Sequence, residues 1–206
     1  MTYEGTARYD GWTEADGVPP LVLRAVELAR SIGFPLCVHP GTGRMLAALA
    51  GGVVDGVIGE TGTGTGVGVA WMLSTMPSSS RVVTIELDEE RATAAADLFV
   101  DHPGVTVLHG EANELAAHAP FDLLVLDTKC DEGPLHRATL DPRSLLSPGG
   151  VVVKDDLWPM DSWPPLDYEG EVDDLRVRFF EHPDLLTTEV DVADGFAVQI
   201  GRLRPL

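Results

Sequence analysis

An apolar run that leads directly into a glycine-rich loop places the strongest constraint on this chain. Residues 53–58 have the composition of a buried strand, and residues 59–68 then read Gly-Glu-Thr-Gly-Thr-Gly-Thr-Gly-Val-Gly. Glycine has no Cβ, so a backbone rich in glycine can bend sharply and a ligand can lie directly against it. A buried strand that passes through such a loop into a helix predicts a nucleotide-binding turn in an α/β fold.

The rest of the chain alternates between apolar runs and segments with helical spacing. Continuous apolar strands separated by helices indicate a parallel sheet that helices cover on both faces. Near the end, two further runs flank Asp194-Gly195, which predicts an antiparallel β-hairpin. We therefore expect an α/β fold with a Rossmann-like, doubly wound sheet of seven strands, mostly parallel with a C-terminal antiparallel hairpin. The expected strands are residues 53–60, 81–87, 105–110, 121–127, 151–155, 185–192 and 196–203.

The length of 206 residues corresponds to one domain with room for a substantial core. Residues 1–18 are polar and punctuated by glycine, and we expect them to form an irregular or mobile N-terminal arm. Residues 19–206 are expected to form a single domain, which begins with a helix over residues 21–32.

Two later segments carry expectations of their own. Residues 135–146 have helical spacing and are expected to form a helix that ends at Ser147-Pro148-Gly149-Gly150. The tryptophan- and proline-rich stretch 157–166 is too long for a tight turn. We interpret it as a loop over the active site.

The formal net charge of −19 limits the partners of the chain. Nucleic acids and anionic membranes bind through lysine and arginine, so this balance predicts neither as a partner and favours a small-molecule acceptor. The two cysteines, Cys37 and Cys130, form no motif, and we expect reduced thiols in a cytoplasmic protein. We also expect no signal peptide and no membrane span, because no apolar run approaches the ~20 residues that cross a bilayer.

Acidic residues stand where the first two expected strands end. Glu60 directly precedes the glycines, and a carboxylate there suits a cationic amino group better than a pyrophosphate. Glu86 follows the glycines by about 20 residues, where a carboxylate can accept hydrogen bonds from both hydroxyls of a ribose. Together the two acids predict a pocket for S-adenosylmethionine (AdoMet). The less favoured interpretation is a nicotinamide-binding oxidoreductase, which Glu60 and the terminal hairpin argue against.

Three aspartates occupy the ends of the fourth and fifth expected strands. Asp127, Asp155 and Asp156 should converge, because ligands and side chains gather beyond the carboxyl ends of neighbouring parallel strands. Converging carboxylates repel one another, and a hard divalent cation such as Mg²⁺ or Ca²⁺ relieves that repulsion. Two alternatives stay open. Either Asp155 caps the following turn while Asp156 is merely exposed, or the pair hydrogen-bonds the substrate directly.

Several short motifs in a fixed order give the chain a family resemblance. They are Gly43-Arg44-Met45-Leu46, the loop 60–66 with Trp71, Thr84-Ile85-Glu86-Leu87-Asp88, His109-Gly110-Glu111-Ala112, residues 121–127, Pro148-Gly149-Gly150-Val151, Asp155-Asp156-Leu157-Trp158 and Asp194-Gly195-Phe196-Ala197-Val198. From about residue 36 to residue 203, the chain resembles the cation-dependent O-methyltransferases, the class I family of the catechol and caffeoyl-CoA O-methyltransferases. Each motif is modest alone, and their order and spacing together are fairly specific.

The resemblance implies a role for each part of the site. Glu60 and the glycines would hold the methionine part of AdoMet, and Glu86 would hold the ribose. Asp127, Asp155 and Asp156 would bind a divalent cation that lowers the pKa of adjacent acceptor hydroxyls. The acceptor would be a small hydroxylated aromatic or natural-product intermediate, and a homodimer is expected. The other residues implied to contact AdoMet are Val38, Gly62, Thr63, Gly66, Leu87, Glu111, Ala112 and Asp127.

Two positions depart from the family pattern. The family has a catalytic lysine three places after the aspartate of strand four, whereas here Lys129 follows Asp127 by two places. Lys129 is therefore the expected catalytic residue, or it instead forms a salt bridge to Asp131 or Glu132. Asp156 stands where the family has asparagine, which makes the site more anionic. These departures leave two alternatives open, a metal-independent methyltransferase and a non-catalytic AdoMet-binding protein.

Overall fold

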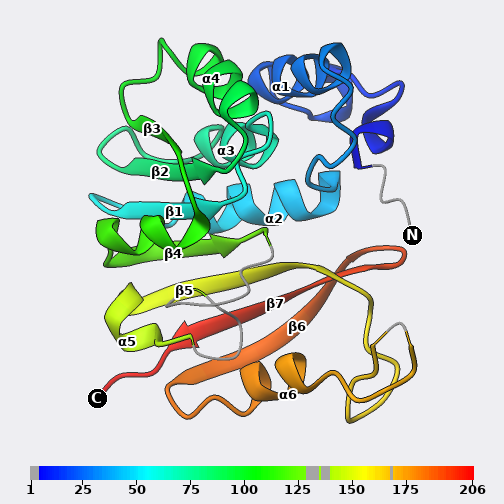
Figure 1. Cartoon of the computed structure of the whole chain (residues 1–206), viewed down its shortest axis with the longest axis vertical. Coiled ribbons are helices and arrows are strands. Elements are labelled where there is room, and N and C mark those ends of the chain that lie inside the picture. Colours follow the sequence, from blue (N-terminus) through cyan, green and yellow to red (C-terminus); the bar gives the residue numbers. More distant parts are fainter. Residues whose placement is uncertain (1–4, 129–134, 136–139, 168) are drawn as a thin grey trace.

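The computed structural model describes residues 5–128, 135, 140–167 and 169–206 of the chain. Seven strands form one sheet, namely β1 Val57–Thr61, β2 Arg81–Glu86, β3 Val105–His109, β4 Phe121–Leu126, β5 Leu146–Leu157, β6 Leu185–Ala193 and β7 Phe196–Leu203. Their order is β3-β2-β1-β4-β5-β7-β6, which runs from top to bottom in Figure 1. The pairs from β3 to β5 are parallel, and β7 is antiparallel to both β5 and β6. The predicted fold class, with its antiparallel C-terminal hairpin, is confirmed.

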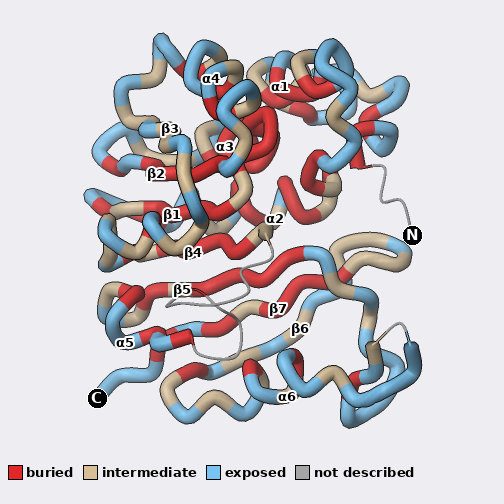
Figure 2. Tube along the Cα trace, in the orientation of Figure 1, coloured by how far each residue is buried: buried red, intermediate tan, exposed pale blue. Residues whose placement is uncertain are grey.

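Helices cover both faces of this sheet. The first face carries α1 Pro20–Ser31, α2 Pro40–Ala50, α3 Val67–Leu73 and α4 Glu89–Leu98, and the second carries the 3-10 helix η3 Ala112–His118, α5 Pro142–Leu145 and α6 Asp174–Phe180. Each face has its own apolar core, and successive strand residues alternate between the two, as Val152 and Val153 do. Figure 2 shows the buried trace continuing through β1, β4, β5 and α3. In the described part of the chain, no helix combines the length and apolar composition needed to cross a membrane.

The N-terminal segment packs against the domain. Two short 3-10 helices, η1 Gly5–Tyr9 and η2 Glu14–Asp16, occupy the stretch that we expected to be an irregular arm. Tyr9 and Val18 are only 1% and 2% exposed and belong to the core under α1. The division of the chain at residue 18 stays a prediction.

Strand β1 begins later than the apolar run suggested. It starts at Val57 rather than at residue 53, because a buried hydroxyl holds the preceding residues in a bend. Ser80 donates a hydrogen bond to the carbonyl oxygen of Val53 (2.8 Å) and accepts one from the N–H of Gly56 (3.2 Å). Apolar composition therefore marked a stretch that is not part of the strand ladder, in which Val53 is buried and Val54 is 67% exposed.

Strand β5 begins earlier than expected. It starts at Leu146 and includes residues 147–150, for which we had predicted a helix end and a turn. Leu146 pairs with Phe121 of β4, and a register shift follows before the regular ladder. Of the helix expected over residues 135–146, only α5 is helical among the described residues. Pairing with β4 has overridden the local turn signal of the prolines and glycines.

A buried ion pair ties α6 to the last strands. Arg176 of α6 and Glu189 of β6 have side chains that are 3% and 6% exposed, and the guanidinium donates two hydrogen bonds to the carboxylate. The same guanidinium donates to the carbonyl oxygen of Trp158 (2.6 Å), and the Arg176 carbonyl accepts from the amide of Gln199 on β7 (3.3 Å). Buried charges need such pairing to be tolerated. The pair therefore positions the chain that follows β5.

Replacing this arginine tests the interaction. Arg176→Leu would leave the Glu189 carboxylate buried without its cation, and we expect the free energy of unfolding to fall by about 3–5 kcal/mol. The control is Arg178→Leu on the exposed side of the same helix, with an expected change within about 0.5 kcal/mol. Urea denaturation followed by circular dichroism measures both. Equal losses in the two variants would show that the buried pair has no special role.

Candidate functional site

The predicted acids lie at one edge of the sheet. Glu60 is near the end of β1, Glu86 ends β2, Asp127 directly follows β4, and Asp155 is close to the end of β5. From β1 the chain proceeds to β2 on one side and later to β4 on the other, so the strand order reverses at this point. A reversal of this kind leaves a crevice outside the carboxyl ends of the strands, where ligands bind in open α/β sheets.

A sharp turn connects β1 to α3 at this edge. The N–H groups of Gly62 and Thr63 both donate to the carbonyl oxygen of Ile85 (2.9 and 3.1 Å), which holds the loop against β2. Gly62 has a φ of 84°, and a Cβ at this position would lie 2.8 Å from the carbonyl oxygen of Asp127. Only glycine combines that backbone conformation with so close an approach. Gly66 then forms the N-cap of α3.

Glu60 is a buried carboxyl group at the base of the turn, only 2% exposed. The Thr84 hydroxyl donates to its Oε2 (2.7 Å) and lies 2.6 Å from the Thr63 hydroxyl, which must be the donor to Thr84 because a hydroxyl carries one proton. A Cβ on Gly68 would lie 2.3 Å from Oε1 of Glu60. Burial raises the pKa of Glu60 to about 8; the Thr84 hydrogen bond opposes this shift, and the nearby Glu86 adds to it.

A narrow cavity opens beside Glu60. On one side lies a segment without helix or strand, residues 34–38, which we call the wall segment; its Phe34, Leu36, Cys37 and Val38 line the cavity. On the other side are the glycine loop and Asp127. The cavity thus brings together five predicted cofactor residues, which are Val38, Glu60, Gly62, Thr63 and Asp127.

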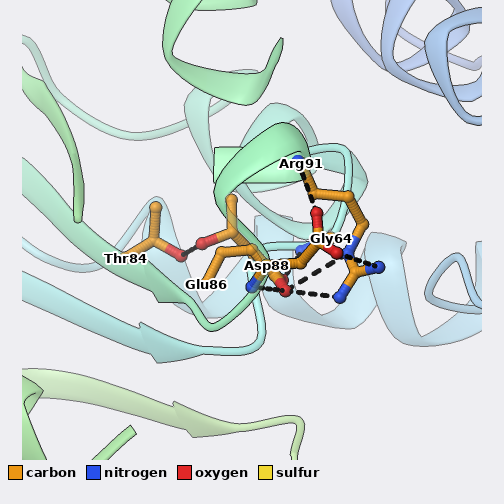
Figure 3. A network of polar contacts seen from close by, with 6 residues as sticks. Gly64, Thr84, Glu86, Asp88 and Arg91 are labelled. Atoms are coloured by element: carbon orange, nitrogen blue, oxygen red, sulfur yellow. Dashed lines mark hydrogen bonds and ion pairs between the residues drawn. The ribbon is translucent and has the colours of Figure 1, made fainter. Parts of the chain in front are cut away.

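Glu86 lies beside the cavity with its carboxylate already hydrogen-bonded (Figure 3). Its Oε2 accepts a hydrogen bond from the Gly64 N–H (2.8 Å). Its Oε1 accepts one from the Asp88 N–H (3.0 Å) and one from Nη2 of Arg91 on α4 (2.8 Å). The Arg91 guanidinium also lies over the ring of Phe34, 5.0 Å from its centroid. Neither Arg91 nor Phe34 was predicted from the sequence. For Arg91, the sequence offers one signal of a role at the site, namely an arginine five places after a strand-end acid.

The three predicted metal ligands come together. Asp127, Asp155 and Asp156 each offer a carboxylate oxygen, and these oxygens lie within 4.8 Å of one another. Asp155 is buried and lies 3.4 Å from the donating hydroxyl of Thr42 on α2, whereas Asp156 is exposed. Asp156 has a φ of 62°, a left-handed conformation that aspartate and asparagine adopt more readily than other non-glycine residues. An oxygen donor set of this kind fits a hard divalent cation.

The remaining predicted residues are placed as follows. Ala112 begins η3, and Glu111, which is exposed, forms its N-cap. Leu87 follows β2 and is 63% exposed. Lys129 lies outside the described residues. The other lysine, Lys154, is buried on the second face of the sheet and donates to the side-chain oxygen of Gln199 (3.2 Å).

Comparison with known proteins agrees with this geometry. Residues 60–157 match a protein family described as a methyltransferase domain. A protein of Mycolicibacterium vanbaalenii that is provisionally described as an O-methyltransferase is 34% identical over 140 residues, which cover 65% of this chain and 61% of that protein. A "probable O-methyltransferase" of Mycobacterium tuberculosis is 31% identical over 152 residues, covering 69% and 66%. The chain thus spans slightly less than two thirds of the length of these relatives.

Solved structures share the whole fold. The O-methyltransferase TomG of Streptomyces achromogenes, solved with bound AdoMet, has a TM-score of 0.70 at 20% identity and covers 100% of both chains. The O-methyltransferase of Bacillus cereus, solved with S-adenosylhomocysteine (AdoHcy), has a TM-score of 0.72 at 20% identity and covers 95% of this chain and 99% of that one. The chain has the fold of these methyltransferases, and its residues 60–157 match the methyltransferase domain family. The matched region begins at Glu60 and includes the glycine turn and Glu86.

The raised pKa of Glu60 predicts a pH-dependent stability. Because its folded-state pKa lies above the ordinary value of 4.5, the folded protein holds a proton that the unfolded chain releases between pH 4.5 and about 8. The stability from this proton is complete below pH 4.5 and is lost as the pH rises through 8. Glu60→Gln cannot ionise, so its free energy of unfolding relative to wild type should rise between pH 5 and pH 8.5, by an amount on the order of 3–5 kcal/mol.

Chemical denaturation at four pH values across this range measures the difference. Glu90→Gln, on the exposed side of α4, is the control and should show a constant offset from wild type. Parallel pH profiles for Glu60→Gln and wild type would mean that Glu60 ionises at an ordinary pH.

Proposed function

We propose that this chain is an AdoMet-dependent O-methyltransferase that acts on a hydroxyl group of a small acceptor. The observation that carries the proposal is the cavity in which the buried Glu60 and the glycine loop face the wall segment, with Glu86 beside it. The relatives described as O-methyltransferases and the solved O-methyltransferases with AdoMet or AdoHcy support it. The net charge of −19 favours an acceptor that is not a polyanion, such as a hydroxylated aromatic or natural-product intermediate.

The residues around the cavity would divide the cofactor between them. Glu60 and the loop residues Gly62, Thr63 and Gly66 would hold the methionine part, whose ammonium group would favour the ionised form of Glu60. Glu86 would accept hydrogen bonds from the ribose hydroxyls, with Arg91 orienting its carboxylate. The residues proposed to complete the site are Val38, Leu87, Glu111, Ala112 and Asp127.

The transfer itself requires positioning more than covalent chemistry. Bound AdoMet would supply the methyl group and take back the electron pair of its carbon–sulfur bond, and the residues around the cavity would have to hold it in line with the acceptor oxygen. The walls of the cavity would fix the sulfonium and exclude water. Lys129 is the proposed acceptor of the hydroxyl proton, on the basis of its place after β4 in the sequence.

A divalent cation is proposed as a second cofactor. Asp127, Asp155 and Asp156 would hold it, because their three carboxylate oxygens converge within 4.8 Å. A cation held there would supply the positive charge that lowers the pKa of the acceptor hydroxyls. The metal-independent methyltransferase remains the competing interpretation, and the homodimer and the cytoplasmic location stay predictions from the sequence.

Calorimetric titration with AdoHcy tests the cofactor site. We expect wild type to bind, and we expect Glu86→Gln to raise the dissociation constant roughly tenfold or more, because hydrogen bonds to a charged group contribute about 1.5–3 kcal/mol. Glu90→Gln on the neighbouring helix should bind like wild type. A wild-type protein that binds neither AdoHcy nor AdoMet would reject the proposed function, and NAD(H) would then be titrated.

Methyl transfer to catechol, measured with and without Mg²⁺ and a chelator, tests the cation. We expect Asp155→Asn to lower the Mg²⁺-dependent rate about a hundredfold or more, since a cation contributes several kcal/mol to such a step. Asp156→Asn should lose less, because Asp156 is exposed whereas Asp155 is buried, and asparagine tolerates the same φ. Asp55→Asn is the control, since Asp55 also has a positive φ (51°) but is not in the aspartate cluster. A rate that the chelator leaves unchanged would favour the metal-independent enzyme.

A further inference from the structure

The first helical turn of the described chain, η1, runs along the outer side of the wall segment. The Thr6 N–H donates to the carbonyl oxygen of Pro35 (3.0 Å), and the Thr6 hydroxyl donates to that of Phe34 (2.8 Å). The same hydroxyl lies 3.1 Å from Sγ of Cys37. Two of these three partners, Phe34 and Cys37, also line the cavity.

Tyr9 joins the wall segment to the helix that leaves the glycine loop. Its hydroxyl donates to the carbonyl oxygen of Val38 (2.9 Å) and accepts from Nε1 of Trp71 on α3 (2.9 Å). Tyr9 is 1% exposed, and burial raises the pKa of its hydroxyl, so the group keeps its proton for donation. Trp71 is itself held in place, because a Cβ on Gly43 of α2 would lie 2.3 Å from its ring.

The wall segment depends on such contacts for its position. Its residues form no helix and no strand, so no ladder of backbone hydrogen bonds fixes them. Apart from the hydrogen bond that the Phe34 N–H donates to the carbonyl oxygen of Ala29 (2.8 Å), tertiary contacts hold this segment, and losing one of them lowers the free energy needed to open it locally. The Tyr9 hydroxyl connects this wall with α3, and Sγ of Cys37 lies 4.0 Å from the hydroxyl of Thr65 in the glycine loop.

We propose that Tyr9 is a positioning residue of the cofactor site, and that η1 is part of the site rather than an appendage to it. The Tyr9 hydroxyl helps to set the separation between the wall segment and α3, and so the width of the cavity. This inference rests on the proposed function, because it names a residue that shapes the AdoMet pocket without touching the cofactor. Without the hydroxyl, the Val38 carbonyl and the Trp71 N–H lose their shared partner, and the wall moves outward.

The test compares Tyr9→Phe with a matched variant at the far end of β1. Ser80 is also buried, and its hydroxyl also accepts from one backbone N–H and donates to one carbonyl, those of Gly56 and Val53. Ser80→Ala therefore removes an equivalent pair of hydrogen bonds away from the cavity. Both variants are titrated with AdoHcy at a temperature at which circular dichroism shows them folded, and hydrogen exchange of the wall-segment amides is followed by mass spectrometry.

We expect Tyr9→Phe to raise the dissociation constant for AdoHcy about tenfold, which corresponds to the loss of hydrogen bonds to two buried partners. Ser80→Ala should change it less than about twofold, within the effect of remote substitutions. The wall-segment amides should exchange faster in Tyr9→Phe only, and the KM for the acceptor should stay unchanged in both. If Tyr9 had a purely structural role, both variants would lower the melting temperature, but AdoHcy affinity would not differ between them.

The other outcomes would overturn the positioning role, the proposed function or both. If wild type binds AdoHcy and Tyr9→Phe binds it equally well, the positioning role is overturned while the proposed function stands. Equal losses in Tyr9→Phe and Ser80→Ala would assign the effect to general destabilisation and also overturn it. A wild-type protein that does not bind AdoHcy overturns both proposals. If Tyr9→Phe does not fold, Trp71→Phe removes the donor to the same hydroxyl, and unchanged AdoHcy affinity in that variant would overturn the inference.

Discussion

The site depends on the absence of side-chain atoms at two places around the turn after β1. At Gly62 the turn approaches the backbone of Asp127 so closely that a Cβ would lie 2.8 Å from its carbonyl oxygen, and at Gly68 a Cβ would lie 2.3 Å from the Glu60 carboxylate. The first approach brings β1 and the end of β4 to one cavity. The second leaves room for Glu60 beneath α3. Larger residues at either place would separate groups that the cavity needs side by side.

The carboxylates at this edge are stabilised in three different ways. Glu86 is surrounded by donors, with two backbone N–H groups and Arg91 on its oxygens. Glu60 has one hydroxyl donor and is deeply buried, so its pKa rises and the proton itself removes the charge. The aspartate cluster instead gathers three oxygens within 4.8 Å, which is the arrangement that a cation would stabilise. In the proposed function, these environments would suit Glu60 to a cationic amino group, Glu86 to a pair of hydroxyls and the aspartates to a metal ion.

Much of the architecture could be predicted from local patterns, and the errors have physical causes. The C-terminal hairpin was expected at residues 185–192 and 196–203 and is observed at β6 and β7, because an Asp-Gly turn between alternating strands is a short-range signal. The start of β1 was placed too early because apolar composition and strand pairing are different properties, and the Ser80 hydroxyl holds residues 53–56 in a bend outside the ladder. The start of β5 was placed too late because pairing between Leu146 and Phe121 lies beyond what a local turn signal contains.

Short windows of the sequence encode most of the strands and the positions of the acids on them, since strand periodicity, glycine turns and strand-end residues are local patterns. These patterns were enough to place Glu60, Glu86, Asp127 and the Asp155-Asp156 pair at one edge of a parallel sheet. The surroundings of these acids depend instead on packing between distant segments. Tyr9, Phe34 and Arg91 reach the site from segments without a motif, through contacts between residues far apart in the chain. Such contacts follow from the packing of the elements, and packing leaves no local pattern in the sequence.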